Sequence, residues 1–141
     1  MKKEVTTEVA IILKDKGYRW KTLKYFKFGS IFRDTILQWD IPVDYNDGTH
    51  KHRVSVPTLN DVKDWFRIEK HIRIHIEWMP EDQDAMCYYP VIKYEDENRH
   101  HKHIYKRIVE IDENGIGMGY GYYDTHEEAL LEGIKIALKL I

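Results

Sequence analysis

Residues 71–78 read His-Ile-Arg-Ile-His-Ile-Glu-Trp, so apolar and polar side chains alternate strictly along this stretch. Because successive side chains of a β-strand point to opposite faces, the pattern places the three isoleucines and Trp78 on one face and polar groups on the other. A sheet with one apolar and one polar face is typical of antiparallel pairing. We therefore predict a strand whose isoleucine face lies under helices.

Two helices are predicted before this strand. Residues 6–16 begin with a threonine that can cap a helix, and Gly17 occupies the position of a left-handed C-cap. Residues 58–70 form the second helix, with Thr58 as its cap. The apolar side of the first helix is expected to consist of Val9, Ile12 and Leu13, and that of the second of Leu59, Val62, Trp65 and Phe66.

The third helix closes the chain. Thr125 and Glu128 form a capping box, and apolar residues then recur at every third or fourth position up to Ile141. Gly133 stands inside this helix, where glycine costs about 1 kcal/mol relative to alanine. Since small residues flank its face, we expect the helix to approach the sheet closely at this point.

The residue pattern of the remaining chain predicts strands. Residues 18–56 hold two to four strands, and Asn46-Asp47-Gly48 is a strong hairpin signal within them. Residues 86–94 and 103–111 are predicted as two further strands. Pro90 has no N–H for a ladder, which favours an edge strand or a bulge at that position.

These elements follow one another as helix, strands, helix, strands, helix. The order predicts the α+β class, with three helices packed on an antiparallel sheet. A chain of 141 residues has the usual size of one domain, so residues 1–141 are interpreted as a single α+β domain.

Composition limits the setting and the partners. The net charge of −2 gives no overall field for a polyanion or a membrane surface. The single cysteine, Cys87, cannot close a disulfide within the chain, and no run approaches the ~20 apolar residues of a membrane span. We expect a cytoplasmic protein that does not associate with membranes.

Two parts of the chain resemble a known group of proteins. They are Val56-Pro57-Thr58-Leu59 through Trp65-Phe66-Arg67 to Ile72-Arg73-Ile74, and Glu127-Glu128-Ala129-Leu130 with Ala137-Leu138-Lys139-Leu140-Ile141. Together they resemble a family of small uncharacterised proteins of the bacteriophage and mobile-element type from gut bacteria. The resemblance covers residues 56–78 and 122–141 and implies a fold and a bacterial cytoplasmic setting. It assigns no activity and no catalytic residues.

Histidines offer one candidate site. His50 with His52, and His101 with His103, are His-x-His pairs whose side chains share a face if the backbone is extended. Together the pairs are able to hold Zn²⁺ or another transition metal, and His71 and His75 are also predicted to share a strand face. The alternative is that these histidines are solvated residues of turns and hairpin connections.

A second candidate lies in residues 14–33, which interleave basic and aromatic side chains. Such a pattern suits single-stranded nucleic acid, because lysines neutralise phosphates while aromatic rings stack on bases. In the competing interpretation, which we favour, the aromatic rings face a core and the basic groups face water. The residues that would bind nucleic acid are Arg19, Trp20, Lys21, Lys24, Tyr25 and Lys27.

Signals for catalysis or a cofactor are weak. The glycines from Gly115 to Gly121 fall at every second position, which matches a glycine-faced strand rather than a phosphate loop. The acidic stretches 44–48 and 81–84 are interpreted as turns, and neither serine stands in a nucleophile elbow. No cofactor is predicted. The weak signals leave enzymatic activity open and favour a protein that is not an enzyme.

The leading hypothesis is therefore a small accessory protein of phage or mobile-element type that acts by binding another macromolecule, with a homo-oligomer as the favoured form. Its many tyrosines and a possible edge strand favour a protein partner. Nucleic-acid binding through residues 14–33 is the alternative hypothesis, and a histidine-based metal site is the third.

Overall fold

The computed structural model of the protein describes residues 3–28, 36–82, 85–95, 103–106, 109–111, 117–119 and 123–141. Three helices and antiparallel sheets occur in this part of the chain, in the order helix, strands, helix, strands, helix, which confirms the predicted α+β class. No helix in the described ranges is long and apolar enough to cross a lipid bilayer.

Two compact units make up the chain, Met1–Trp65 with Ile141 and Phe66–Leu140, and each is described by itself. The single domain over residues 1–141 stays a prediction.

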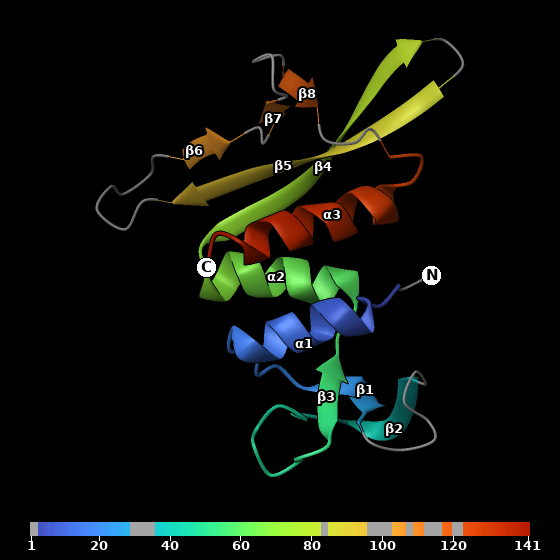
Figure 1. The fold of residues 1–141 in the computed structure, drawn as a ribbon, viewed down its shortest axis with the longest axis vertical. Coiled ribbons are helices and arrows are strands. Elements are labelled where there is room, and N and C mark those ends of the chain that lie inside the picture. The colour runs from blue at the N-terminus through green and yellow to red at the C-terminus, as the bar shows by residue number, and fades with distance from the viewer. Residues whose placement is uncertain are drawn as a thin grey trace. The chain divides into compact units, whose positions relative to one another are not determined.

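The first unit is built on a three-stranded antiparallel sheet with the order β2-β1-β3. Its strands are β1 (Thr22–Lys27), β2 (Ile36–Val43) and β3 (Arg53–Val56), and helix α1 (Thr7–Asp15) packs against β3 (Figure 1). β1 is thus the central strand, and β2 is an edge of the described sheet.

Helix α1 begins and ends as its sequence predicts. The Thr6 hydroxyl accepts a hydrogen bond from the Val9 N–H at 3.3 Å, and Gly17 has a φ of 90°, which is the left-handed region that glycine enters at low cost. Val9 and Leu13 are buried as expected. The expectation for Ile12 was wrong: its side chain is exposed, and Ala10 is buried instead.

The hairpin expected at Asn46-Asp47-Gly48 does not form. A turn is present and Gly48 has a φ of 84°, but β2 and β3, the strands on either side, pair with β1 and not with each other. The Asn-Gly type of signal reports local turn conformation, whereas pairing is decided by the whole sheet.

Helix α2 (Leu59–Glu69) starts at the predicted cap, because the Thr58 hydroxyl accepts a hydrogen bond from the Asp61 N–H at 3.1 Å. Its first residues belong to the first unit and its last residues to the second. In the first unit, Val62 and Trp65 are buried, and the Trp65 ring lies 5.3 Å from that of Tyr18. The predicted apolar side of this helix is confirmed by the burial of Leu59, Val62, Trp65 and Phe66.

The second unit contains a sheet of order β4-β5-β6, a separate pair β7-β8, and helix α3 (His126–Leu138) lying along β4 and β5 (Figure 1). The strands are β4 (Ile72–Asp82), β5 (Ala85–Glu95), β6 (His103–Lys106), β7 (Val109–Ile111) and β8 (Gly117–Gly119). Ile72 and Ile74 are buried, which confirms the inward face at these two residues, whereas Ile76 is half-buried and the side chain of Trp78 lies outside the described residues. The strand predicted over residues 103–111 is divided into β6 and β7.

Pro90 lies in a central strand, not at an edge, and the register of β4 with β5 runs past it without a bulge. The prediction was wrong because the backbone N–H of a strand residue serves only one of the two neighbouring strands, and the ladder with β4 does not use the N–H at position 90. Tyr88 exchanges both backbone hydrogen bonds with Tyr123, so the backbone polar groups of residues 88 and 90 point away from β4. On that side the described pairing with β6 covers residues 92–95, so Pro90 lies between this pairing and the bridge from Tyr88 to Tyr123.

Helix α3 is capped as predicted, since the Thr125 hydroxyl accepts a hydrogen bond from the Glu128 N–H at 3.2 Å. The expected close approach at Gly133 is confirmed. A Cβ at this position would lie 2.9 Å from Cγ2 of Ile74 and 2.9 Å from Cβ of Pro90. The glycine therefore lets the helix backbone rest directly on β4 and β5.

Candidate functional site

Strand β2 contains a large bulge opposite Leu23. Lys24 pairs with Gln38, but Thr22 pairs with Val43, so residues 39–42 of β2 stand opposite the single residue Leu23. A bulge bends an edge strand outward and redirects its side chains. It takes these four residues out of regular pairing with β1.

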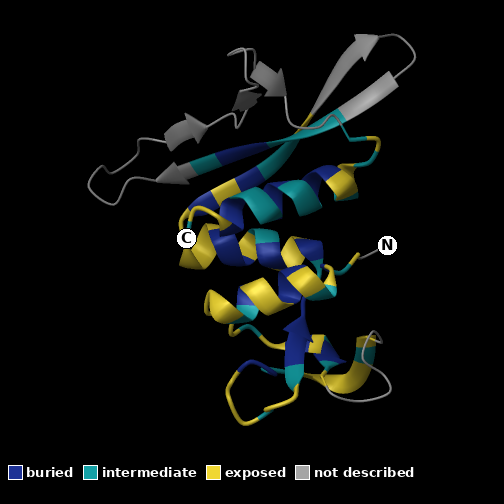
Figure 2. Ribbon diagram, in the orientation of Figure 1, coloured by how far each residue is buried: buried dark blue, intermediate teal, exposed yellow. Residues whose placement is uncertain are grey.

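The bulge exposes large apolar side chains. Trp39 is 53% exposed and Ile41 is 60% exposed, although both belong to residue types that are usually buried. Most of β2 is correspondingly drawn as exposed in Figure 2. We name the exposed apolar side chains at the bulge end of these two neighbouring strands the β1–β2 strip; it consists of Leu23, Trp39 and Ile41.

A pocket of about 340 Å³ lies beside the bulge, and Leu23 and Pro42 form part of its wall. Its polar groups are mostly engaged with one another. Lys24 forms an ion pair with Glu4, the Thr58 hydroxyl caps α2, and the Thr22 hydroxyl donates to the Lys24 carbonyl at 2.8 Å. The remaining lining residues are Lys21, Val56, Pro57 and Asp61.

The carboxylate of Glu4 is held in its charged form by this arrangement. Its pKa is lowered, mainly by the hydrogen bond from the Lys24 ammonium group, while partial burial acts in the opposite direction. The pair therefore neutralises Lys24, which lines the pocket. Lys21 is left as the exposed cation of the pocket rim.

The basic and aromatic residues of the nucleic-acid hypothesis do not share one open surface. Tyr25 is buried, with the Tyr45 ring at 4.6 Å on one side and the Arg53 guanidinium 4.9 Å from its centroid. Arg19 forms an ion pair with Asp44 at 2.8 Å. Trp20 and Lys27 are half-buried, and Lys21 is exposed. The aromatic rings thus follow the competing, core-facing interpretation at Tyr25, and nucleic-acid binding stays a prediction.

The acidic loop at residues 44–49 is a turn, as its sequence predicts. Oδ1 of Asp44 accepts from the Asn46 N–H at 2.9 Å, and Oδ1 of Asp47 accepts from the backbone and hydroxyl of Thr49 at 2.9 and 2.6 Å. The buried Asn46 side chain donates to the Tyr18 carbonyl and accepts from the Ser55 N–H. These bonds fix the loop to the sheet.

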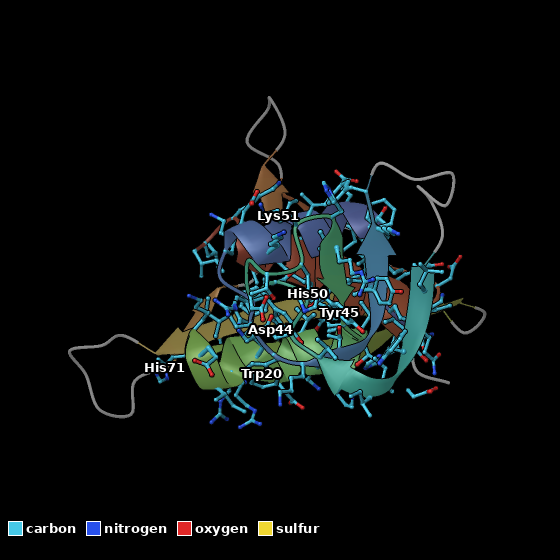
Figure 3. The ribbon with its side chains drawn as sticks, turned by 90° about the horizontal axis from the view of Figure 1, so that it is seen from below. Trp20, Asp44, Tyr45, His50, Lys51 and His71 are labelled. Atoms are coloured by element: carbon cyan, nitrogen blue, oxygen red, sulfur yellow. The ribbon has the colours of Figure 1, made fainter. Side chains whose placement is uncertain are left out.

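The histidine pairs have a different geometry from the one assumed for a metal site. His50 and His52 are not on an extended strand, because the Arg53 N–H closes a turn onto the His50 carbonyl at 3.1 Å. The His50 ring lies edge-on to Tyr45, with centroids 5.4 Å apart, in the loop seen in Figure 3. His101 lies outside the described residues, as does the side chain of His103.

No group of three metal-ligating side chains comes together among the residues whose side chains are described. The histidine metal site stays a prediction. His71 and His75 do not form the expected strand-face pair, since His71 precedes β4 with a φ of 55° and His75 instead contacts Glu77 at 3.2 Å. Tyr89 donates to the same carboxylate at 2.6 Å, and this bond is the main reason that the pKa of Glu77 is lowered.

Comparison with known proteins adds no relative. No protein family, no curated protein and no solved structure matches this chain. We therefore infer the function from the fold and the surface described above.

Sequence reasoning missed the β1–β2 strip. Trp39, Asp40 and Ile41 alternate as a half-buried strand would, which predicts burial of the two apolar side chains. The only signal against burial was Pro42, since proline inside a strand marks an edge or a bulge.

Proposed function

We propose that the protein is a non-enzymatic binding protein that associates with another protein chain through the β1–β2 strip. The observation that carries the proposal is the exposure of Trp39 and Ile41 by the bulge in β2. Exposed tryptophan is the residue type that most often anchors protein interfaces, and edge bulges commonly redirect side chains next to functional sites.

The apolar side chains of the strip would gain free energy when covered. A tryptophan buries 150–250 Å² at full burial, so Trp39 still exposes on the order of 100 Å² of its surface. At about 25 cal/mol per Å², covering that area contributes roughly 2 to 3 kcal/mol. Covering Ile41 and Leu23 adds to this free energy. The gain from these few side chains offsets the entropic cost of ordering the partner.

A protein partner fits this surface better than a nucleic acid does. Stacking on bases needs open ring faces beside free cations. Of the residues in the nucleic-acid hypothesis, Tyr25 is buried, Lys24 and Arg19 are engaged with carboxylates of the same chain, and Lys21 is an exposed cation near the bulge. Asp40, in the middle of the bulge, would also repel phosphates.

The origin of the protein in a bacteriophage or mobile element and its cytoplasmic setting belong to the same proposal. Both are supported by the sequence resemblance. Accessory proteins of this kind need no catalytic centre, because they act by occupying a surface of another macromolecule.

Site-specific photo-crosslinking tests the proposal. A photoreactive phenylalanine analogue would replace Trp39 in the full chain, and the matched control would carry it at Ile68, which is 49% exposed but lies outside the strip. We expect a protease-sensitive adduct from position 39 and none from position 68 in cells that express the protein. Equal adducts at both positions, or an adduct at position 39 removed by nuclease alone, would contradict the proposal.

A further inference from the structure

Two opposite charges stand at the bulge end of the strip. Asp40 lies between Trp39 and Ile41 and is exposed. Lys21 is also exposed, and it lines the same pocket as Pro42 at the end of β2. Neither charge has an ion-pair partner within the described ranges. The apolar anchors are therefore flanked by one free anion and one free cation.

A surface of this composition is complementary to itself. In a two-fold contact the same patch meets its copy, so residue i contacts residue j and residue j contacts residue i. A patch with charges of one sign would repel its copy, whereas a patch with both signs is able to pair each charge with its opposite. The β1–β2 strip satisfies this condition through Asp40 and Lys21.

We infer that the partner of the β1–β2 strip is a second copy of this chain, bound about a two-fold axis with Asp40 of each copy facing Lys21 of the other. The inference rests on the proposed function. Trp39 of one copy covers apolar side chains of the other, and the pockets beside Leu23 and Pro42 are partly covered in the pair.

The contact is made by side chains rather than by a continuous sheet. Residues 39–42 leave the regular ladder, and Pro42 has no N–H to offer a neighbouring strand. The area is that of a modest interface. The three side chains of the strip expose only part of the ~800 Å² that each partner of a standard interface buries. We therefore expect a dimer that dissociates on dilution.

Sedimentation equilibrium of the full chain tests the apolar contact. Ile41→Ser and Trp39→Ser are expected to weaken the dimer at least tenfold, while Ile68→Ser, the same change at a comparably exposed isoleucine, leaves it unchanged. Circular dichroism would show that all variants are folded. The inference would be overturned if the wild-type chain stayed monomeric over a 100-fold range of protein concentration centred on ~10 μM, which is the affinity scale of weak interfaces.

A charge exchange tests the two-fold arrangement. Asp40→Lys alone and Lys21→Asp alone each place like charges opposite one another in a homodimer, so both variants are expected to be mainly monomeric. Mixing them in equal amounts pairs Lys with Asp at both contacts, and a heterodimer is expected to form. If the mixture stays monomeric while both single variants lose the wild-type dimer, this arrangement is overturned.

The two tests separate the inference from the proposed function. A chain that is monomeric in solution but gives crosslinks from position 39 to a different protein would retain the proposed function and reject self-association. A chain that is monomeric and gives no position-specific crosslink would reject both.

Discussion

Gly133 of α3 lies so close to Pro90 of β5 that a Cβ at position 133 would come within 2.9 Å of the proline Cβ. Pro90 has no freedom to move this atom aside, because it belongs to the pyrrolidine ring of a central strand. At this contact between α3 and β5 there is therefore room for glycine only.

Replacement of Gly133 by alanine is expected to destabilise the second unit by about 1 to 3 kcal/mol, the usual cost of overpacking a core. Helix propensity alone predicts the opposite sign, since alanine is favoured over glycine by about 1 kcal/mol inside a helix. Urea denaturation of the variant decides between the two. A gain in the free energy of unfolding would show that α3 does not press on β5 at this position.

Tyr18 offers a test in the first unit. Its hydroxyl is buried without a hydrogen-bond partner among the described groups, so the desolvation cost of that group is not repaid. We expect Tyr18→Phe to be neutral or to raise the free energy of unfolding by roughly 1 kcal/mol, with the ring packing on Trp65 retained. Thermal or urea denaturation at neutral pH measures the difference, and a loss of more than 1 kcal/mol would mean that the hydroxyl is bonded in solution.

The same residue predicts a dependence on alkaline pH. Burial raises the pKa of Tyr18 above its usual value near 10, and the nearby Asp61 carboxylate adds to the shift. The folded state therefore binds the proton more tightly, and the stability contributed by the neutral phenol is complete below pH 10 and is lost as the pH rises above it. Tyr18→Phe lacks this contribution, so its stability should fall less steeply between pH 9.5 and pH 11 than that of the wild type. Parallel curves for the two proteins would contradict the assignment.

His71 provides a comparison of backbone conformations. Its φ of 55° places a non-glycine residue in the left-handed region immediately after α2, where glycine is the usual residue. We expect His71→Gly to be more stable than His71→Ala by about 1 kcal/mol, because alanine keeps the steric cost of this conformation while glycine removes it. Equal stabilities would indicate that residue 71 adopts another conformation in solution.

Much of the fold follows from local chemistry that the sequence displays. Thr6, Thr58 and Thr125 cap the three helices as predicted, and Ile72 and Ile74 of β4 face inward. Gly133 even indicated the close approach of α3 to the sheet. These features depend on neighbours within a few residues or on a simple two-residue period, so a single sequence is sufficient to recognise them.

Features that depend on pairing between distant segments were missed. The turn at Asn46-Asp47-Gly48 looks like a hairpin, but β1 lies between the two strands that it connects. Pro90 looks like an edge residue, yet β5 lies between β4 and β6. The bulge in β2 was missed for the same reason, because the residues opposite it lie elsewhere in the chain.

The irregular backbone of β2 also affects whether its exposed apolar side chains lead to aggregation. An edge strand that carries tryptophan and isoleucine in regular conformation is a template on which further chains can add and grow into fibrils. Between Trp39 and Pro42 this chain interrupts that template while leaving the side chains accessible. The bulge thus keeps these apolar side chains exposed without a regular edge to which further strands would add, and under the proposed function a single partner covers them.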